Sequence, residues 1–390
     1  MKITGVETLF CDAGWRPWIF LKISTDQGLV GWSEVTDSHG SPRGIAGVVE
    51  DLAPFLLGAD PLAHEKLYWD LYRSTRQSPG SIIAKAIGGI ENALLDLKGK
   101  ALGVSVAELF GGPLRDRLRV YWSHCGTSRV RAYDVVGEKR IADLAGIREM
   151  GAEVAARGFT ALKTNVFLPG TEPPIYMPGF KTAWTPELNV DRGIIRACHD
   201  QMAAFQDGAG PAVDLIMDLN FNFKTEGYIQ IARALEPLDL LWVELDTFDP
   251  QALRQVRDAT RLAVASCENL YHLRQFLPFL TAHAMDVCVI DVIWNGFAQA
   301  KKISDAAEVF EMNVAPHNYQ SHLSTFISAQ FCAAVPNFRI FEVDVDDVPW
   351  KDELTTRQPE IEDGFLSVPT GPGWGVEVNE EVLAAHPWPR

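Results

Sequence analysis

Eight short apolar runs recur along the chain from about residue 119 onward, with amphipathic stretches of helical length between most of them. The runs are residues 120–123, 160–165, 215–220, 240–245, 262–267, 287–292, 313–317 and 339–343. Each run has the length of a buried strand, so the alternation predicts βα units around a parallel sheet. Eight such units match a TIM-type barrel. A doubly wound open sheet is the alternative, but it normally carries a glycine fingerprint after its first strand, and none is present here.

The first 115 residues follow a different pattern. Residues 1–10 and 18–25 are β-rich, and Gln27-Gly28 marks a turn, which predicts a hairpin-like start. Helical patterns follow at 63–74 and 82–102. Strands followed by helices favour a small α+β domain. We therefore expect three parts: an α+β domain over 1–115, a barrel over 116–346, and an irregular segment over 347–390 that returns to the first domain.

Composition narrows the classes of partner. The formal net charge of −16 disfavours nucleic acid and anionic membranes, and an acid-binding site would need local Lys, Arg or a metal ion. The six cysteines form no CxxC pair, which suits a reducing compartment. The pattern of the N-terminus indicates a strand and not a signal peptide. No apolar run approaches the roughly 20 residues that span a bilayer. We expect a cytoplasmic protein.

A segment rich in Pro and Gly, residues 166–190, interrupts the second βα unit. Loops of this length in compact domains are usually functional or disordered. Its place after a barrel strand puts it on the catalytic face, which favours a lid. A surface loop without a function explains the segment about as well.

Three acidic residues lie at or near the ends of consecutive predicted strands: Asp218, Glu244 and Glu268. They are 26 and 24 residues apart, which is one βα unit each. Three neighbouring strands would deliver three carboxylates to one mouth of the barrel, where they would repel one another. A hard divalent cation with oxygen ligands resolves that conflict, and Mg²⁺ is the natural choice. A single acid at a strand end is more often solvated or ion-paired.

The segments 217–220, 242–244 and 267–269 resemble the three metal-ligand strands of the mandelate racemase subgroup of the enolase superfamily. Residues 31–34 and 86–112 resemble its capping domain, and 371–376 resemble its C-terminal motif. The resemblance covers essentially the whole chain. It implies an N-terminal α+β capping domain over a modified TIM barrel, (β/α)7β, with Mg²⁺ as cofactor. It also implies a homo-oligomer.

Asp291 and His317 end adjacent predicted strands. A carboxylate beside an imidazole fixes its tautomer and raises its basicity, which suits proton transfer near neutral pH. The pair resembles the His–Asp dyad of the family. If the three acids were absent, the better interpretation of this pair would be a buried histidine that only forms a hydrogen bond with an acid and has no catalytic role.

The second predicted strand departs from the family pattern. Racemases and many relatives carry Lys-x-Lys there, whereas this chain has Lys163 and Asn165. Residues two apart on a strand point to the same side, so both should point into the barrel. Asn165 cannot act as a base. Lys163 could hold positive charge near the substrate carboxylate or act as a base itself.

This departure favours one reaction over another. Racemisation needs acid/base groups on both faces of one carbon, while β-elimination of water can use one group on one face. We therefore hypothesise dehydration, with His317 taking the α-proton and protonating the departing hydroxyl. Mg²⁺ and Lys163 would stabilise the enediolate, an assignment that the resemblance carries.

Other residues are weaker candidates. By resemblance, Glu342 is a glutamate that donates a hydrogen bond to the enediolate when protonated. Asn165 and Asn220 could bind or orient substrate, and Arg16 and Trp18 of the first loop could contact it. Tyr271 and Tyr319 are expected to pack, and Cys267 stands where the family usually has glycine, with no functional explanation.

The leading hypothesis is a Mg²⁺-dependent acid-sugar dehydratase that converts an aldonate or aldarate into a 2-keto-3-deoxy acid. A racemase, epimerase or cycloisomerase of the same superfamily that uses Lys163 opposite His317 is the second hypothesis. A non-catalytic barrel that binds a sugar acid is the third. The sequence does not identify the sugar acid.

Overall fold

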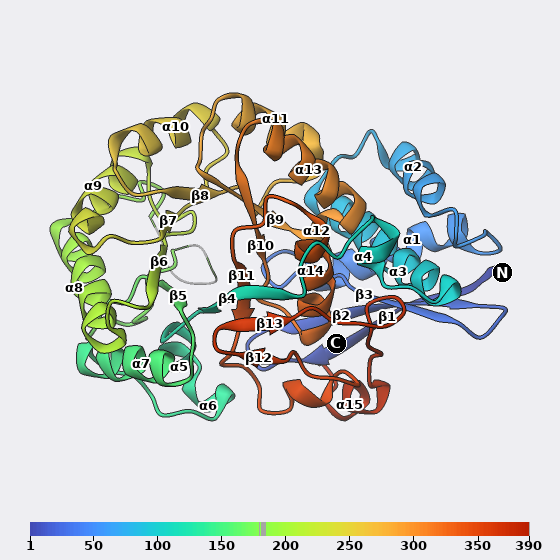
Figure 1. Ribbon diagram of the computed structural model, residues 1–390, viewed down its shortest axis with the longest axis horizontal. Helices are drawn as coiled ribbons and strands as arrows, with labels where there is room; N and C mark the ends of the chain where they lie inside the picture. The colour runs from blue at the N-terminus through green and yellow to red at the C-terminus, as the bar shows by residue number, and fades with distance from the viewer. Residues whose placement is uncertain (179, 181–184, 390) are drawn as a thin grey trace.

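The computed structural model describes residues 1–178, 180 and 185–389 (Figure 1). The chain begins with an antiparallel sheet of three strands in sequence order, β1 (Ile3–Asp12), β2 (Pro17–Thr25) and β3 (Val30–Glu34). Four helices follow it: α1 (Pro42–Leu56), α2 (His64–Thr75), α3 (Ser81–Leu102) and α4 (Val106–Leu109). The predicted hairpin-like start and the two predicted helices are confirmed, whereas α1 was not predicted.

All eight predicted barrel strands are present. They are β4 (Arg117–Ser123), β5 (Ala161–Asn165), β6 (Asp214–Asp218), β7 (Trp242–Glu244), β8 (Val264–Ser266), β9 (Val287–Asp291), β10 (Asn313–His317) and β11 (Phe341–Asp344). The strands from β4 to β10 pair in parallel in sequence order, and β11 pairs in parallel with β4. The sheet therefore curls round until its last strand lies beside its first.

Helices connect successive strands on the outside of the sheet (Figure 1). They are α5 (Thr127–Arg131), α6 (Tyr133–Val136), α7 (Leu144–Ala156), α8 (Arg192–Ala209), α9 (Thr225–Leu235), η1 (Glu236–Leu238), α10 (Pro250–Ala259), α11 (His272–Thr281), α12 (Val292–Asn295), α13 (Phe297–Val309) and α14 (His322–Ala334). Seven strands are thus followed by helices and the eighth is not. This is the (β/α)7β arrangement with an N-terminal α+β domain, and the predicted fold class is confirmed.

The interior of the barrel is filled and is not a pore. The apolar cluster inside the barrel is made of Tyr121, Ala161, Ile216, Trp242, Ala265, Val287, Val289, Ala315 and Ile340. These side chains are all nearly inaccessible to solvent. Because successive strand residues point to opposite sides, the residues two positions further along each strand also point inward, above this cluster.

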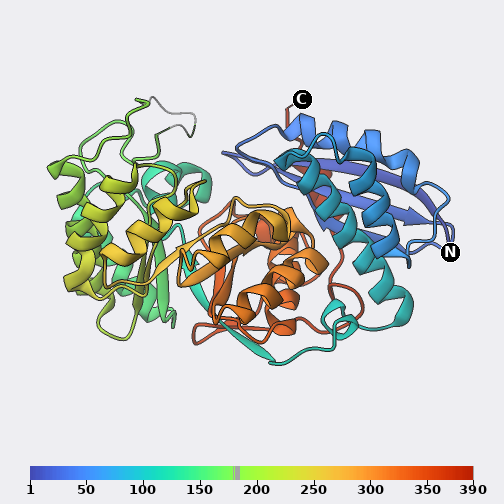
Figure 2. The same cartoon turned by 90° about the horizontal axis from the view of Figure 1, so that it is seen from above.

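Helix α3 holds the first domain against the end of the barrel (Figure 2). Gly88 lies so close to α12 that a Cβ atom there would be 2.7 Å from the backbone nitrogen of Gly296. The side chain of Asn92, also on α3, donates to the Val292 carbonyl and accepts from the Phe297 amide. Gly88 and Asn92 of α3 therefore fix the first domain beside the last units of the barrel.

The C-terminal segment contains η2 (Lys351–Glu353), β12 (Ile361–Glu362), β13 (Phe365–Ser367) and α15 (Glu380–Ala385). Strand β13 pairs antiparallel with β4, and Pro387 forms a bridge with Cys11 of β1. The indole nitrogen of Trp374 donates to the Trp32 carbonyl at 2.8 Å. The segment thus contacts both the barrel and the first sheet. Across the described ranges, the model contains no helix with the length and hydropathy needed to span a bilayer.

Candidate active site

Strand periodicity explains why polar side chains gather at one end of the barrel. Ile216 and Trp242 belong to the apolar cluster inside the barrel, and two residues later come Asp218 and Glu244. The same step leads from Ala315 to His317, and equivalent steps lead to the inward-pointing residues at the ends of the other strands. The carboxyl ends of the strands therefore carry the polar groups directly above an apolar floor.

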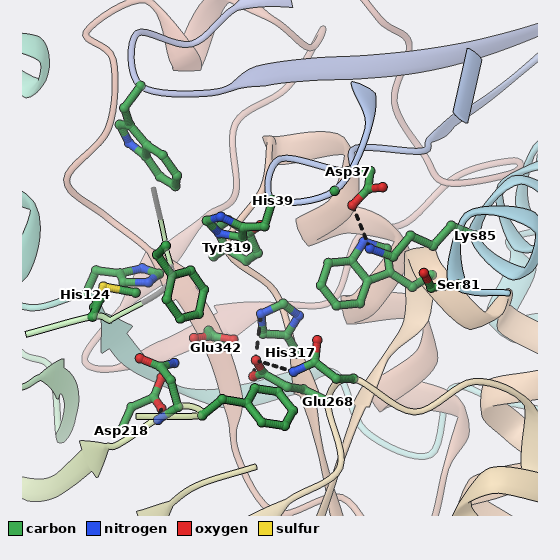
Figure 3. A pocket seen from close by; sticks show the side chains of 18 of the residues that line it. Asp37, His39, Ser81, Lys85, His124, Asp218, Glu268, His317, Tyr319 and Glu342 are labelled. Carbon is green, nitrogen blue, oxygen red and sulfur yellow. Dashed lines mark hydrogen bonds and ion pairs between the residues drawn. The ribbon is translucent and has the colours of Figure 1, made fainter. Parts of the chain in front are cut away.

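A cavity of about 340 Å³ lies over these strand ends (Figure 3). Its lining from the barrel includes Lys163, Asp218, Asn220, Glu268, Asn269, Trp294, His317, Tyr319 and Glu342. The first domain contributes Trp15, Asp37, His39, Ser81 and Lys85. The cavity is thus enclosed jointly by the barrel and by the domain that packs beside its mouth.

The three predicted metal ligands are on neighbouring strands. Asp218 and Glu244 are register partners in β6 and β7, and Glu268 follows β8. Burial, together with the charge of Glu244, raises the pKa of Asp218 to about 7 although Lys163 opposes this. Burial also raises the pKa of Glu268 well above its ordinary value. The structure therefore concentrates carboxyl groups in a place that water reaches poorly, where their negative charge is disfavoured unless a cation lies beside them.

A strained turn brings Glu268 to the cavity. Cys267 has φ of 97°, a left-handed conformation that favours glycine. Its amide donates to Oδ1 of the buried Asp246 at 3.1 Å, and Asn269 donates to the other oxygen of Asp246 at 3.1 Å. The sequence did not identify Asp246, and the left-handed backbone is a physical reason why glycine would suit position 267.

Lys163 compensates the charge of the acids. Its Nζ atom is 2.9 Å from Glu244, 2.8 Å from Glu342 and 3.8 Å from Asp218. Burial alone would lower the pKa of Lys163, but the charges of Glu244 and Glu342 raise it well above the ordinary value. Lys163 is therefore held as a cation, which does not support its use as a base.

Asp218 and Glu268 line the cavity, whereas Glu244 lies beneath it. One oxygen of Glu244 accepts from Lys163 and the other from the indole nitrogen of Trp242, at 2.9 Å each. Among the residues that the structure describes, no three Asp, Glu, His or Cys side chains are already arranged around one point as metal ligands. The donor set nevertheless fits Mg²⁺, because all three side chains offer carboxylate oxygens from adjacent strands.

His317 and Asp291 form a buried pair. Nδ1 of His317 is 2.7 Å from Oδ2 of Asp291, while its Nε2 is 3.7 Å from Glu268. Burial alone would lower the pKa of His317, but the charge of Glu268 and the hydrogen bond to Asp291 raise it to about 10. The other oxygen of Asp291 accepts from the Trp294 amide, which fixes the carboxylate. Nε2 is thus the nitrogen that points into the cavity.

Glu342 is surrounded by hydrogen-bond donors. Its oxygens accept from the Ser123 hydroxyl, the Asn318 amide and Lys163. Burial would raise its pKa, but the charges of Lys163 and His317 lower it to about 2. In this arrangement Glu342 accepts hydrogen bonds, and its predicted role as a donor to the enediolate stays a prediction.

Two residues that were predicted to contact substrate lie outside the lining of the cavity. Arg16 is buried with its guanidinium 2.7 Å from Asp347, and Trp18 is completely buried with its ring against Trp350. Neither residue lines the cavity, because an acid more than 300 residues away binds Arg16 instead. The neighbouring Trp15 lines the cavity and stacks on Tyr319.

Asn165 does not line the cavity, but its side-chain amide donates to Oδ1 of Asn220 at 3.1 Å. Asn220 does line the cavity and has φ of 46°. Asn165 therefore orients a cavity residue in the described structure. Tyr271 and Tyr319, expected only to pack, line the cavity as well.

Sequence reasoning missed several lining residues, notably His124, Arg131 and the Lys85–Asp37 pair, whose ion pair is 2.9 Å long. His124 could have been found, because it directly follows the first predicted barrel strand. Of the insertion over 166–190, Met177 and Phe180 line the cavity, while residues 179 and 181–184 lie outside the described residues. The lid interpretation stays a prediction.

Comparison with known proteins gives concordant matches. The profile described as mandelate racemase / muconate lactonizing enzyme, N-terminal domain, matches residues 6–111, and the profile described as enolase C-terminal domain-like matches residues 146–382. A D-xylonate dehydratase of Haloferax volcanii is 29% identical, over 99% of this chain and 89% of its own length. A D-galactonate dehydratase of Variovorax paradoxus is 30% identical, over 98% and 93%.

A solved structure from Burkholderia xenovorans is 46% identical, with a TM-score of 0.96 over 99% of this chain and 96% of that one. It is described, provisionally, as an L-alanine-DL-glutamate epimerase bound to magnesium and fumarate. The curated relatives and this structure therefore carry names from two different reaction types.

Proposed function

Since the chain belongs to the mandelate racemase / muconate lactonizing enzyme family of the enolase superfamily, we propose that it is a Mg²⁺-dependent acid-sugar dehydratase. The substrate would be an aldonate or aldarate, and the product a 2-keto-3-deoxy acid. The observation that carries the proposal is the His317–Asp291 pair beside three acids, with an amide, Asn165, where relatives carry a second lysine. The curated relatives named as xylonate and galactonate dehydratases support the same reaction.

Asp218, Glu244 and Glu268 would hold the metal. When bound, Mg²⁺ offsets the charge of these acids, including that of Glu268 beside His317, and stabilises negative charge on the substrate carboxylate. Magnesium in the Burkholderia structure supports this assignment. For Glu244 to become a ligand, an oxygen that now accepts from Lys163 or Trp242 must turn toward the cavity.

The proton transfer follows from the geometry of the dyad. Asp291 accepts from Nδ1 of His317, so the ring in its neutral form carries its proton there and presents the Nε2 lone pair to the cavity. Burial alone would lower the pKa of His317, but the charge of Glu268 raises it, so the neutral form is favoured only when a cation offsets that charge. The α-proton of the bound acid passes to Nε2. Lys163, which is held as a cation by its acidic neighbours, stabilises the negative charge that develops on the substrate.

Epimerisation is the second candidate, because the Burkholderia structure at 46% identity carries that name. Inversion at one carbon requires a second base on the other face. Lys163 is bound between two carboxylates and Asn165 cannot accept a proton, so neither supplies that base. Of these two reactions, only dehydration can use His317 as the single acid/base group among the predicted residues.

The test is a panel assay. Purified protein with Mg²⁺ is incubated with xylonate, gluconate, galactonate, glucarate, galactarate and tartrate, and 2-keto acid is measured with semicarbazide. We expect keto acid from at least one acid and none with EDTA. Conversion to an epimer without keto acid would establish the second candidate. Binding by calorimetry without any conversion would instead indicate a non-catalytic barrel.

A further inference from the structure

Among the described residues, His124 lines the cavity together with two other histidines, His39 and His317, and it has no role in the scheme above. His124 follows β4, and β11, which carries Glu342, lies between β4 and β10, which carries His317. Figure 3 shows His124 on one side of Glu342 and His317 on the other. Both histidines line the same cavity, so one substrate molecule can contact both.

His124 has an acidic partner, as His317 does. Its Nδ1 atom is 3.5 Å from Oδ1 of Asp344, a buried oxygen that has no hydrogen-bond partner among the described residues. Among the described residues, Nδ1 has one other polar contact, which is with the Ser123 hydroxyl at 3.4 Å. Both contacts are long, but both are made by Nδ1, which leaves Nε2 for a group in the cavity.

The backbone at His124 supports a functional placement. Its φ of 46° is unusual for a residue other than glycine, and such strain clusters at binding and catalytic sites. Ser123 points inward by strand alternation, and its hydroxyl is bound to Glu342. The left-handed turn lets the very next residue reach the cavity too. His272 and His283 have similar φ angles and do not line the cavity, so it is the place of His124 in the cavity that gives its conformation significance.

From this arrangement we propose that His124 is a catalytic acid, which protonates the departing β-hydroxyl, and that Asp344 positions it. The proposal rests on the proposed dehydratase function and divides the two proton transfers between two histidines. His317 takes the α-proton, and His124 in its protonated form donates from Nε2.

The step balances as follows. The electron pair left by the α-proton forms the double bond between the α- and β-carbons, and the β-carbon–oxygen bond breaks with its pair to oxygen. That oxygen takes the proton from His124 and leaves as water. The resulting enol gains a proton on the β-carbon and loses its hydroxyl proton to become the 2-keto-3-deoxy acid. Proton exchange with water restores both histidines.

The two transfers can be measured separately in D₂O with whichever acid of the panel the wild type converts. Loss of the α-hydrogen from recovered substrate reports proton abstraction, and keto acid reports elimination. We expect His124→Gln to lower elimination roughly 100-fold or more while α-exchange stays within about threefold of wild type. Asp344→Asn should lower elimination less, with exchange again retained.

His199 provides a matched control, because it is paired with Asp200 at 3.1 Å on α8 and does not line the cavity. His199→Gln should leave both rates unchanged. Retained exchange in His124→Gln would show that this variant is folded and binds substrate.

Wild-type elimination by His124→Gln would overturn the assignment and leave the dehydratase function intact. Equal loss of exchange and elimination would overturn it as well, because a residue specific to the second transfer cannot stop the first. A wild type that converts no acid of the panel would refute the proposed function itself.

Discussion

Nδ1 of His317 lies 2.7 Å from Oδ2 of Asp291, on two strands that pair residue for residue. This contact fixes which nitrogen of the imidazole points into the cavity. We predict that Asp291→Asn lowers kcat roughly 1,000-fold, because an asparagine amide can stabilise the wrong tautomer and cannot balance the imidazolium. His317→Asn should abolish α-proton exchange.

Steady-state kinetics on the converted acid, with melting curves to establish folding, would check this. Wild-type kcat in Asp291→Asn would show that the pair is only structural.

Removal of the buried cation should destabilise the barrel. Lys163→Met leaves Glu244 and Glu342 without their shared partner, and breaking a buried ion pair in this way costs about 3–5 kcal/mol. Urea denaturation of the variant and of wild type measures the difference. As a control, Lys66→Met removes an exposed ion pair with Asp70 and should change stability very little. Equal effects of the two substitutions would contradict the role given to Lys163.

Metal dependence should appear in stability as well as in activity. A ligand that binds only the folded state adds about 2.7 kcal/mol at 100 times its dissociation constant, so Mg²⁺ should raise the melting temperature of wild type. Asp218→Asn and Glu268→Gln should lose most of that rise, and EDTA should remove it from wild type. A rise that survives in both variants would place the metal elsewhere.

A buried carboxyl at the interface of the two domains predicts a pH dependence of folding stability. Glu91 of α3 accepts from the Ala298 amide, its other oxygen has no partner among the described residues, and burial raises its pKa from 4.5 to about 8. Between those values the folded state binds more protons than the unfolded state. The free energy of unfolding therefore falls as pH rises from about 5 to 8.

Glu91→Gln should remove up to a few kcal/mol of this decline, since each pKa unit corresponds to about 1.4 kcal/mol. Denaturation at pH 5, 7 and 9 measures it, with Glu7→Gln at an exposed position as the control. Parallel pH profiles for Glu91→Gln and wild type would contradict the assignment.

Local patterns were enough to predict the barrel and most polar groups at its mouth. Because every second residue of a strand points to the same side, Lys163, Asp218 and His317 lie above the apolar residues inside the barrel, independently of how the loops are arranged. The same local reasoning explains why Asp291 and His317 lie together, because their strands were predicted to be neighbours.

The features of the site that were not predicted depend on contacts between residues far apart in the sequence. Arg16 was predicted to reach the substrate, but it is bound by Asp347, whose position depends on the end of the barrel. Burial would raise the pKa of Glu342, but the charges of Lys163 and His317, which come from other strands, lower it. His124 directly follows a predicted strand, but its buried acidic neighbour Asp344 comes from the last strand of the barrel, more than 200 residues later.

The most direct test is proton NMR of the reaction in D₂O with Mg²⁺ and the acid that the panel identifies. The proposed function predicts a 2-keto-3-deoxy acid that carries solvent deuterium at its third carbon, with wild type and not with His317→Asn. Recovered acid with deuterium at an inverted α-carbon and no keto acid would contradict it.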